Sequence, residues 1–307
     1  MDNQDIKVTV RCITYNQKDY IRQCLDGFVM QRTNFCFEAI VHDDASTDGT
    51  DEIVREYAEK YPDIIKPIFE TENQYSKHDG SLGRIMNAHT RGQYVAFCEG
   101  DDYWTDPLKL QKQADFLDAN PQCSLTYHAC KNVFSTPCKI NSLTGDNVKE
   151  SYSEVDLATL YSFQTATVMC RKDILDSDLY KKAQAIGCVF GDILLYFSAS
   201  RFGTIEGVNE QMSVYRRHEG GISQHMYDAD KLLKNFKDWQ KVALLFGGNI
   251  RKIVNKYKLG VYMYGAFTTR KYILFFKMLR LSMFKNPYSI VFSVILSSSY
   301  YYHRLFK

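Results

Sequence analysis

Residues 37–50 of the 307-residue chain read FEAIVHDDASTDGT, an apolar run that stops on acidic and small polar residues. Such a run is typical of a buried strand, and Asp48-Gly49 turns the chain toward a helix. A second stretch of this kind, residues 94–104, reads YVAFCEGDDYW. Crowded carboxylates destabilise a strand end unless a cation or hydrogen-bond donors neutralise them. Because ligands bind at the carboxyl ends of strands in α/β sheets, the two stretches predict one site for a cation and a polar ligand.

Strand-like and helical patterns alternate around these two stretches. Apolar runs predict strands over residues 8–14, 37–43, 64–69, 94–98 and 124–129. Helical spacing of apolar residues predicts helices over residues 19–31, 50–61, 82–90 and 108–120. Alternation at this spacing requires right-handed crossovers, so the chain is expected to form an α/β fold with a mainly parallel, doubly wound sheet.

The alternation weakens after residue 130. Residues 131–160 are polar, which predicts an excursion over the site. Further on, the sequence predicts a strand over 165–171, a helix over about 191–201, and two short strands over 203–208 and 212–216. The chain is then helical, basic and aromatic. We therefore expect one domain over residues 1–228 and a helical extension over residues 229–307.

The formal net charge of +2 hides a division between these parts. Residues 231–307 hold 15 Lys and Arg and one acid, a balance of +14. Residues 1–230 keep 23 of the 38 basic and 35 of the 36 acidic residues, a balance of −12. A basic aromatic tail suits an anionic membrane surface, and a cap on the domain or a dimer contact is the alternative. Nucleic acid would also need basic charge, but the acidic site argues against it.

Several classes of protein are disfavoured by what the sequence lacks. No uncharged apolar run of 18 residues occurs, the run 288–302 is shorter than the roughly 20 residues of a membrane span, and the N-terminus is acidic. The nine cysteines are spaced singly, which favours buried thiols in a cytoplasmic protein. No strand is followed by a dinucleotide-binding or P-loop motif. A nucleotidyltransferase would need a basic, Gly-rich loop where residues 15–18 read YNQK.

The acidic run 99–102, EGDD, is the better candidate for a metal site. Adjacent carboxylates suit Mg²⁺ or Mn²⁺, which keep several waters and complete their shells with ligand phosphates. A loop that caps the following helix is the alternative for such a run.

Taken in order, these motifs resemble those of family-2 inverting glycosyltransferases with the GT-A fold. The resemblance rests on residues 13–16 (ITYN), 43–50 (DDASTDGT), 84–94 and 99–102, and it extends over about residues 6–225. It implies a nucleotide-diphosphate donor, most naturally a UDP-sugar, and a saccharide or lipid-linked acceptor in surface polysaccharide synthesis. A non-catalytic protein that binds sugar nucleotides remains the alternative.

The resemblance also implies roles for individual residues on the donor side. Thr14 and Tyr15 are expected at the nucleotide base and Asn16 at the turn beside it, whereas Asp43 or Asp44 accepts a hydrogen bond from the base or ribose. Arg84 either balances the leaving diphosphate or is a surface arginine. The remaining donor-side positions are Glu99, Gly100 and Arg217. The residues expected to hold the divalent cation are Asp101, Asp102 and His218. Glu99 stands where the family has aspartate, so contact with the ribose or through water is as reasonable as direct metal contact.

The resemblance assigns the proton chemistry to Asp192. An acceptor hydroxyl must lose its proton as it attacks the anomeric carbon, and a carboxylate opposite the diphosphate is the usual general base. Gly191-Asp192 opens a predicted helix in the matching context, although an aspartate there also interacts favourably with the helix dipole. Arg217 and His218 precede Gly220 and Gly221, so this segment either closes over the diphosphate or is a solvated basic loop.

Overall fold

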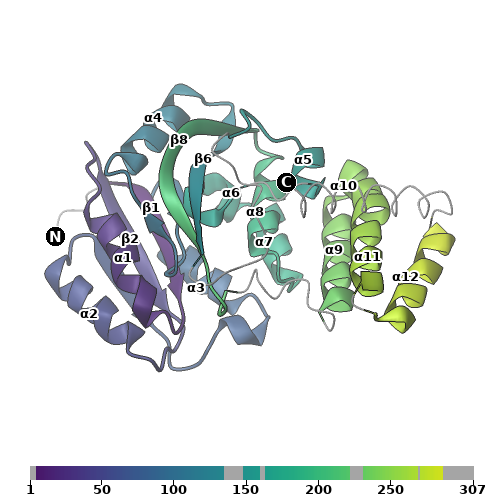
Figure 1. The fold of residues 1–307 in the computed structure, drawn as a ribbon. Coiled ribbons are helices and arrows are strands. Elements are labelled where there is room, and N and C mark those ends of the chain that lie inside the picture. Colours follow the sequence, from purple (N-terminus) through teal and green to yellow (C-terminus); the bar gives the residue numbers. More distant parts are fainter. Residues whose placement is uncertain (1–4, 135–147, 160–162, 222–230, 269, 286–307) are drawn as a thin grey trace.

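The computed structural model describes residues 5–134, 148–159, 163–221, 231–268 and 270–285. Within them, a central sheet is flanked by helices, and a group of C-terminal helices stands at one side of this α/β domain (Figure 1). The predicted α/β fold with a C-terminal helical extension is therefore confirmed. The uncharged run 288–302 and residues 135–147 of the polar excursion lie outside the described residues.

The first half of the sheet is parallel, as predicted. Strand order is β3-β2-β1-β4-β7-β6-β8-β5, and the parallel strands are β1 (Ile6–Thr14), β2 (Cys36–Asp43), β3 (Ile65–Phe69) and β4 (Tyr94–Phe97). Strand β1 pairs with β2 on one side and with β4 on the other, with Thr14 opposite Asp43 and Arg11 opposite Phe97. This pairing brings the carboxyl ends of β1, β2 and β4 to one edge, where the acidic stretches begin.

The second half of the sheet is mixed. It contains β5 (Tyr103–Trp104), β6 (Cys123–Phe134), β7 (Met169–Arg171) and β8 (Thr204–Arg217). Strand β7 runs antiparallel to both β4 and β6, β6 is parallel to β8, and β5 is antiparallel to β8.

Three strand predictions in this half were wrong in their extent. The two short strands predicted over 203–216 form one strand, β8, because it pairs with β6 along most of its length and absorbs the misfit as register shifts opposite residues 128–130. Strand β6 continues to Phe134, so residues 131–134 belong to the sheet and not to an excursion. The strand predicted over 165–171 begins with a 3-10 turn at Thr165–Thr167, and only Met169–Arg171 pairs with β4 and β6.

Helices cover both faces of the sheet, as a doubly wound fold requires. They are α1 (Lys18–Val29), α2 (Thr50–Lys60), α3 (Ser81–His89), α4 (Lys109–Ala119), α5 (Glu154–Thr159), α6 (Lys172–Asp176), α7 (Asp178–Ala185) and α8 (Gly191–Ala199). One core cluster joins α1, α2 and α4 to the parallel strands through residues such as Ile21, Val54 and Leu110. A second cluster gathers α5 to α8 against β6 and β7. Burial of these apolar side chains is the main favourable term for folding.

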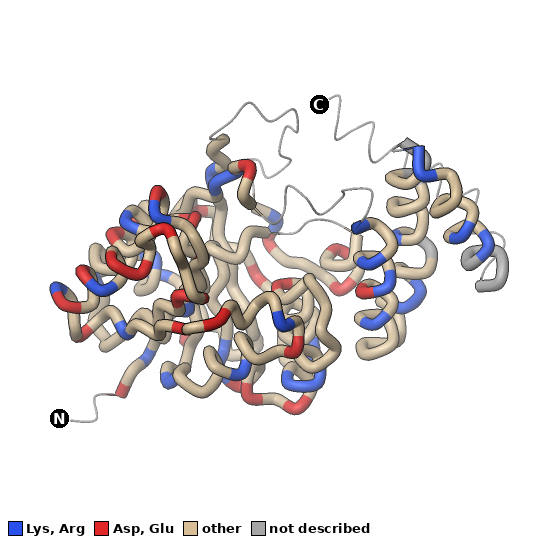
Figure 2. Tube along the Cα trace, turned by 90° about the horizontal axis from the view of Figure 1, so that it is seen from below, with Lys and Arg blue, Asp and Glu red and all other residues tan. Residues whose placement is uncertain are grey.

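The C-terminal helices extend the second core cluster. They are α9 (Leu232–Phe246), α10 (Gly248–Ile253), the π-helical turn Val254–Lys258, α11 (Leu259–Thr268) and α12 (Tyr272–Lys285). Trp239 of α9 packs against Phe190 and Phe197, with ring centroids 5.1 and 6.4 Å apart. Basic residues predominate on these helices, as Figure 2 shows, whereas acidic residues lie mainly on the α/β domain. Within the described ranges, no helix is both long and apolar enough to cross a bilayer.

Candidate active site

Backbone hydrogen bonds tie together the loops that follow β1, β2 and β4. The Asp44 N–H donates to the Thr14 carbonyl at 2.9 Å, and the Gly100 N–H donates to the Ile13 carbonyl at 3.0 Å. A Cβ on Gly100 would lie 2.7 Å from Thr14 Oγ1 and 2.4 Å from Gln17 Oε1, so this position requires glycine. The candidate donor residues of all three strands are thus held at one edge of the sheet.

Asp43 lies beside the turn that Asn16 holds. The Ser46 N–H and hydroxyl donate to the two Asp43 oxygens at 3.0 and 2.5 Å, and burial raises the pKa of Asp43 despite these donors. Asn16 adopts a positive φ of 52°, and its Oδ1 accepts the Thr47 N–H at 2.8 Å. The neighbouring Tyr15 ring is 47% exposed, which leaves its face open to a ligand.

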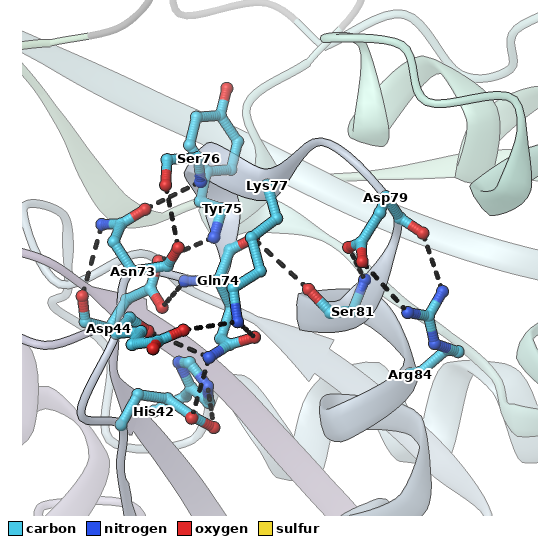
Figure 3. A network of polar contacts seen from close by, with 12 residues as sticks. His42, Asp44, Asn73, Gln74, Tyr75, Ser76, Lys77, Asp79, Ser81 and Arg84 are labelled. Atoms are coloured by element: carbon cyan, nitrogen blue, oxygen red, sulfur yellow. Dashed lines mark hydrogen bonds and ion pairs between the residues drawn. The ribbon is translucent and has the colours of Figure 1, made fainter.

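The Asp44 carboxylate faces a different loop from that of Asp43. Its oxygens accept the backbone N–H groups of Gln74 and Tyr75 at 2.6 and 3.0 Å (Figure 3). Because Asp44 is only 1% exposed, both acceptor atoms are engaged within the protein. Asp43 is likewise only 2% exposed with both oxygens accepting from Ser46, so burial and hydrogen bonding do not distinguish the two aspartates.

Arg84 is paired with a residue of its own loop. Its guanidinium donates to the Asp79 carbonyl at 2.7 Å and lies 3.6 Å from the Asp79 carboxylate (Figure 3). The Arg84 side chain is 63% exposed, as a surface arginine would be. Binding of a diphosphate by Arg84 would have to compete with this ion pair.

The two aspartates after β4 face the end of β8. His218 Nε2 lies 3.0 Å from Asp101 Oδ2, and the Asp102 carboxylate accepts the Arg216 N–H at 2.8 Å. Asp102 is buried, and burial together with the charge of Asp101 raises its pKa. The His218 ring also contacts the Tyr20 ring of α1, with centroids 4.7 Å apart. Asp101 and His218 thus come together across the sheet edge, whereas Asp102 is turned toward the β8 backbone.

The donor atoms of these residues decide whether they could hold a metal. In the part of the chain that the structure describes, no cluster of three His, Cys, Asp or Glu residues is arranged to hold a metal. Asp101 and His218 nevertheless supply an oxygen and a nitrogen donor side by side, a set that Mn²⁺ accepts. Mg²⁺ and Mn²⁺ sites on phosphate substrates commonly use few protein ligands, because phosphate oxygens and waters provide the rest. The residues present therefore fit a divalent cation that arrives with a diphosphate.

Glu99 and Asp192 share one electrostatic environment. Burial, together with the charges of Asp101 and Asp192, raises the pKa of Glu99 to about 8, while the charge of Arg11 opposes the rise. Burial likewise raises the pKa of Asp192, whose carboxylate accepts the Ile193 N–H at 2.8 Å at the start of α8. The loop after β4 and the start of α8, about ninety residues apart in the sequence, therefore place two carboxylates whose charges influence one another.

Arg217 packs on aromatic rings at the end of β8. Its guanidinium lies 5.6 Å from the centroid of the Phe134 ring and 5.8 Å from that of the Tyr215 ring. These contacts are within the range of cation–π attraction. They hold the Arg217 guanidinium against these rings, on the residue that precedes His218.

Sequence reasoning missed two residues of this site, Arg11 and Tyr75. Arg11 is 6% exposed, and its guanidinium donates to Asn87 Oδ1 at 2.8 Å, while the Asn87 amide donates to Gln184 Oε1 at 3.0 Å. An arginine inside the apolar run 8–13 was the available signal, because a buried charge requires partners. Tyr75 gave no signal, since a tyrosine in a polar loop is unremarkable without its contacts.

Solved structures with this architecture define the class of the fold. A fragment of Staphylococcus aureus TarS, residues 1–349, in complex with UDP-GlcNAc superposes with a TM-score of 0.57 and 21% identity over 78% of this chain and 66% of that chain. The mannosyltransferase PcManGT of Pyrobaculum calidifontis, in complex with GDP-Man and Mn²⁺, gives a TM-score of 0.58 and 16% identity over 96% and 88%. The chain has the GT-A fold.

Sequence comparison then identifies the family. The model of glycosyl transferase family 2 matches residues 9–173, and the chain belongs to this family. An uncharacterised Mycobacterium tuberculosis protein is 37% identical over 220 residues, which are 72% of this chain and 61% of that protein. The putative teichuronic acid biosynthesis glycosyltransferase TuaG of Bacillus subtilis is 26% identical over 75% of this chain and 87% of its own length. The match thus spans about three-fifths of the mycobacterial relatives.

Proposed function

We propose that the chain is a metal-dependent inverting glycosyltransferase that moves a sugar from a UDP-sugar to a saccharide or lipid-linked saccharide in surface polysaccharide synthesis. One observation carries the proposal: at the carboxyl edge of a GT-A sheet, the acidic residues after β4 include Glu99, whose pKa is raised by the charge of Asp192 on α8. Family membership and the similarity to TuaG support the reaction class and the kind of product.

The donor nucleoside would bind at the ends of β1 and β2. The exposed ring of Tyr15 offers a stacking face for the base, and Asn16 holds the turn that presents it. Asp43 or Asp44 would accept a hydrogen bond from the base or ribose, with Thr14 and Gly100 forming the close-packed floor. The complex of TarS with UDP-GlcNAc supports a uridine nucleotide as the donor.

The diphosphate would lie between the loop after β4 and the end of β8. Asp101 and His218 would hold Mn²⁺ or Mg²⁺ there, with Asp102 fixing the loop through Arg216. A bound divalent cation neutralises charge that develops on the leaving diphosphate. Arg217 would add a second positive charge. Glu99 would contact the ribose or the donor sugar, between the cation and Asp192.

Asp192 would act as the general base. It stands at the first turn of α8, apart from the metal-side residues, and burial raises its pKa. A carboxylate with a raised pKa is a stronger base for the acceptor hydroxyl. Attack from the side of Asp192 with departure of the diphosphate on the other side would invert the anomeric configuration.

The basic helices would bring this site to the inner face of the plasma membrane. Ile273 and Phe276 of α12 are 78% and 62% exposed, in a part of the chain rich in lysine and arginine. Exposed apolar side chains with adjacent positive charge favour anionic headgroups. The eight cysteines of the described residues are free thiols, which supports a cytoplasmic enzyme.

Two measurements test this proposal together. Isothermal titration of UDP with and without Mn²⁺ should reveal metal-coupled binding, and mass spectrometry should detect UDP released from one nucleotide sugar when candidate lipid-linked acceptors are supplied. A non-catalytic sugar-nucleotide-binding protein would bind UDP and release none from any donor. Equal UDP binding with and without Mn²⁺ would refute the metal-dependent mechanism.

A further inference from the structure

The loop at residues 73–77 has a tightly specified backbone (Figure 3). The buried Asp44 carboxylate accepts the N–H groups of Gln74 and Tyr75, and the Asp44 carbonyl accepts the Asn73 amide at 3.3 Å. Within the turn, Asn73 Oδ1 accepts the Ser76 N–H at 2.8 Å, and the Ser76 hydroxyl donates to the Asn73 carbonyl at 2.9 Å. Charge-assisted bonds of this kind hold a backbone firmly, so the direction of the Tyr75 Cα–Cβ bond is fixed as well.

The Tyr75 ring nevertheless points away from this network. Figure 3 shows the ring extending from the turn on the side opposite Asp44. The residue is 40% exposed, and its ring meets only the edge of the His78 ring, with centroids 5.7 Å apart, among the described aromatic contacts. A rigid support thus presents a large, partly open aromatic face.

The residues that follow Tyr75 pack close to the start of the helix that carries Asp192. A Cβ on Gly187 would lie 2.8 Å from the His78 carbonyl, and one on Gly80 would lie 3.3 Å from the Gln184 carbonyl. The segment 75–80 therefore packs against the connection between α7 and α8. Burial raises the pKa of the Tyr75 hydroxyl, and the charge of Asp192 adds to the rise, as expected for neighbours.

We propose that Tyr75 binds the acceptor, with its ring stacked on the apolar face of the acceptor sugar next to Asp192. Aromatic faces carry negative potential and attract polarised C–H groups, which pyranose rings present on one face. A preset ring also loses little conformational freedom on binding. This inference rests on the proposed function, because Asp192 is the group that would deprotonate the acceptor. On this proposal, the acceptor subsite next to Asp192 binds a saccharide, because an aromatic ring recognises the apolar face of a sugar.

Ligand-observed saturation-transfer NMR tests the inference without requiring turnover. The probes are the methyl β-glycosides of glucose, galactose and N-acetylglucosamine, each added to the full chain in the presence of UDP. We expect saturation of the C–H protons on one ring face of at least one probe. Tyr75→Leu should weaken binding of that probe about tenfold, whereas Tyr75→Phe should retain it. Phe202→Leu is the matched control, because Phe202 is 49% exposed beyond the opposite end of α8.

The outcomes separate this inference from the proposed function. Absence of saturation for every probe with the wild-type chain, or equal saturation with Tyr75→Leu, would overturn the acceptor role. Tyr75→Leu could instead weaken the binding of UDP-GlcNAc relative to UDP and leave the glycoside signal intact. This result would assign the ring to the donor sugar and would also overturn the acceptor role of Tyr75. Failure of the proposed function would appear elsewhere, as absent UDP binding or absent UDP release.

Discussion

His218 Nε2 lies 3.0 Å from Asp101 Oδ2, although the two residues are 117 positions apart. The contact joins the loop after the central parallel strand β4 to the end of the mixed strand β8. It depends on the pairing of β5 with β8, which places Tyr103 opposite Val214 and so aligns the two segments. The proposed metal side of the site is therefore assembled by the second half of the sheet.

Replacement of His218 should weaken the coupling between Mn²⁺ and UDP. We expect His218→Ala to reduce the affinity for UDP in the presence of Mn²⁺ by about tenfold or more, with little effect when the metal is absent. The measurement is isothermal titration of UDP with and without Mn²⁺. His89→Ala is the control, because His89 is exposed on α3. Identical Mn²⁺ dependence in His218→Ala and wild type would exclude His218 as a ligand.

Replacement of the buried Asp44 should destabilise the fold more than replacement of an exposed aspartate does. Asp44→Asn offers an amide group to one of two buried backbone donors, so we expect a loss of about 1.5–3 kcal/mol in the free energy of unfolding. Urea denaturation measures the change. Asp79→Asn is the matched variant, since Asp79 accepts the Ser81 N–H at 2.8 Å but is exposed. Equal losses in both variants would contradict the anchoring role of Asp44.

The buried amine of Lys109 should make stability rise with pH. Its Nζ lies 3.8 Å from the Trp104 ring centroid and has no hydrogen-bond partner among the described residues. Burial lowers the pKa of Lys109 from 10.5 to about 7. Between these values the unfolded chain binds more protons than the folded chain, so this lysine makes the free energy of unfolding increase with pH.

Lys109→Met should remove that contribution. Urea denaturation at pH 7 and pH 9 should show a smaller increase in the free energy of unfolding for Lys109→Met than for wild type. Lys182→Met, at an exposed lysine of α7, should behave as wild type. A pH response in Lys109→Met as steep as that of wild type would disprove the lowered pKa.

The raised pKa of Asp192 should appear in the pH dependence of sugar transfer. A general base must be ionised, so kcat/KM should fall as the pH drops through the raised pKa of Asp192, above the ordinary value of 3.8. The measurement is the rate of UDP release at a subsaturating acceptor concentration across acidic pH, with protein stability checked at each point. An acid limb centred at or below 3.8 would be inconsistent with a buried base.

Much of the parallel half could be predicted from the sequence because local patterns specify it. Apolar runs predicted β1, β2 and β4, and the acidic residues that follow β2 and β4 lie at one edge of the sheet. The two-residue strand β5 and the continuous β8 were not predictable, since both depend on partners distant in the sequence.

The same limit applied to the candidate site. Arg11 could be noticed as a charge inside an apolar run, yet its neighbours Asn87 and Gln184 come from α3 and α7. Tyr75 and the anchoring role of Asp44 depend on a contact between residues 31 positions apart, which no local pattern encodes. Spacing along the chain therefore identifies acidic candidates but does not say which oxygen atoms remain available to a ligand.

The most direct test of the central claim is sugar transfer by Asp192→Asn, measured as UDP release and product formation beside UDP binding. The asparagine keeps the size of the side chain but cannot take the acceptor proton. We predict that transfer falls by about 10²- to 10⁴-fold while the Kd for UDP stays close to that of wild type. Intact transfer in Asp192→Asn, with UDP binding unchanged, would contradict the assignment of Asp192 as the general base.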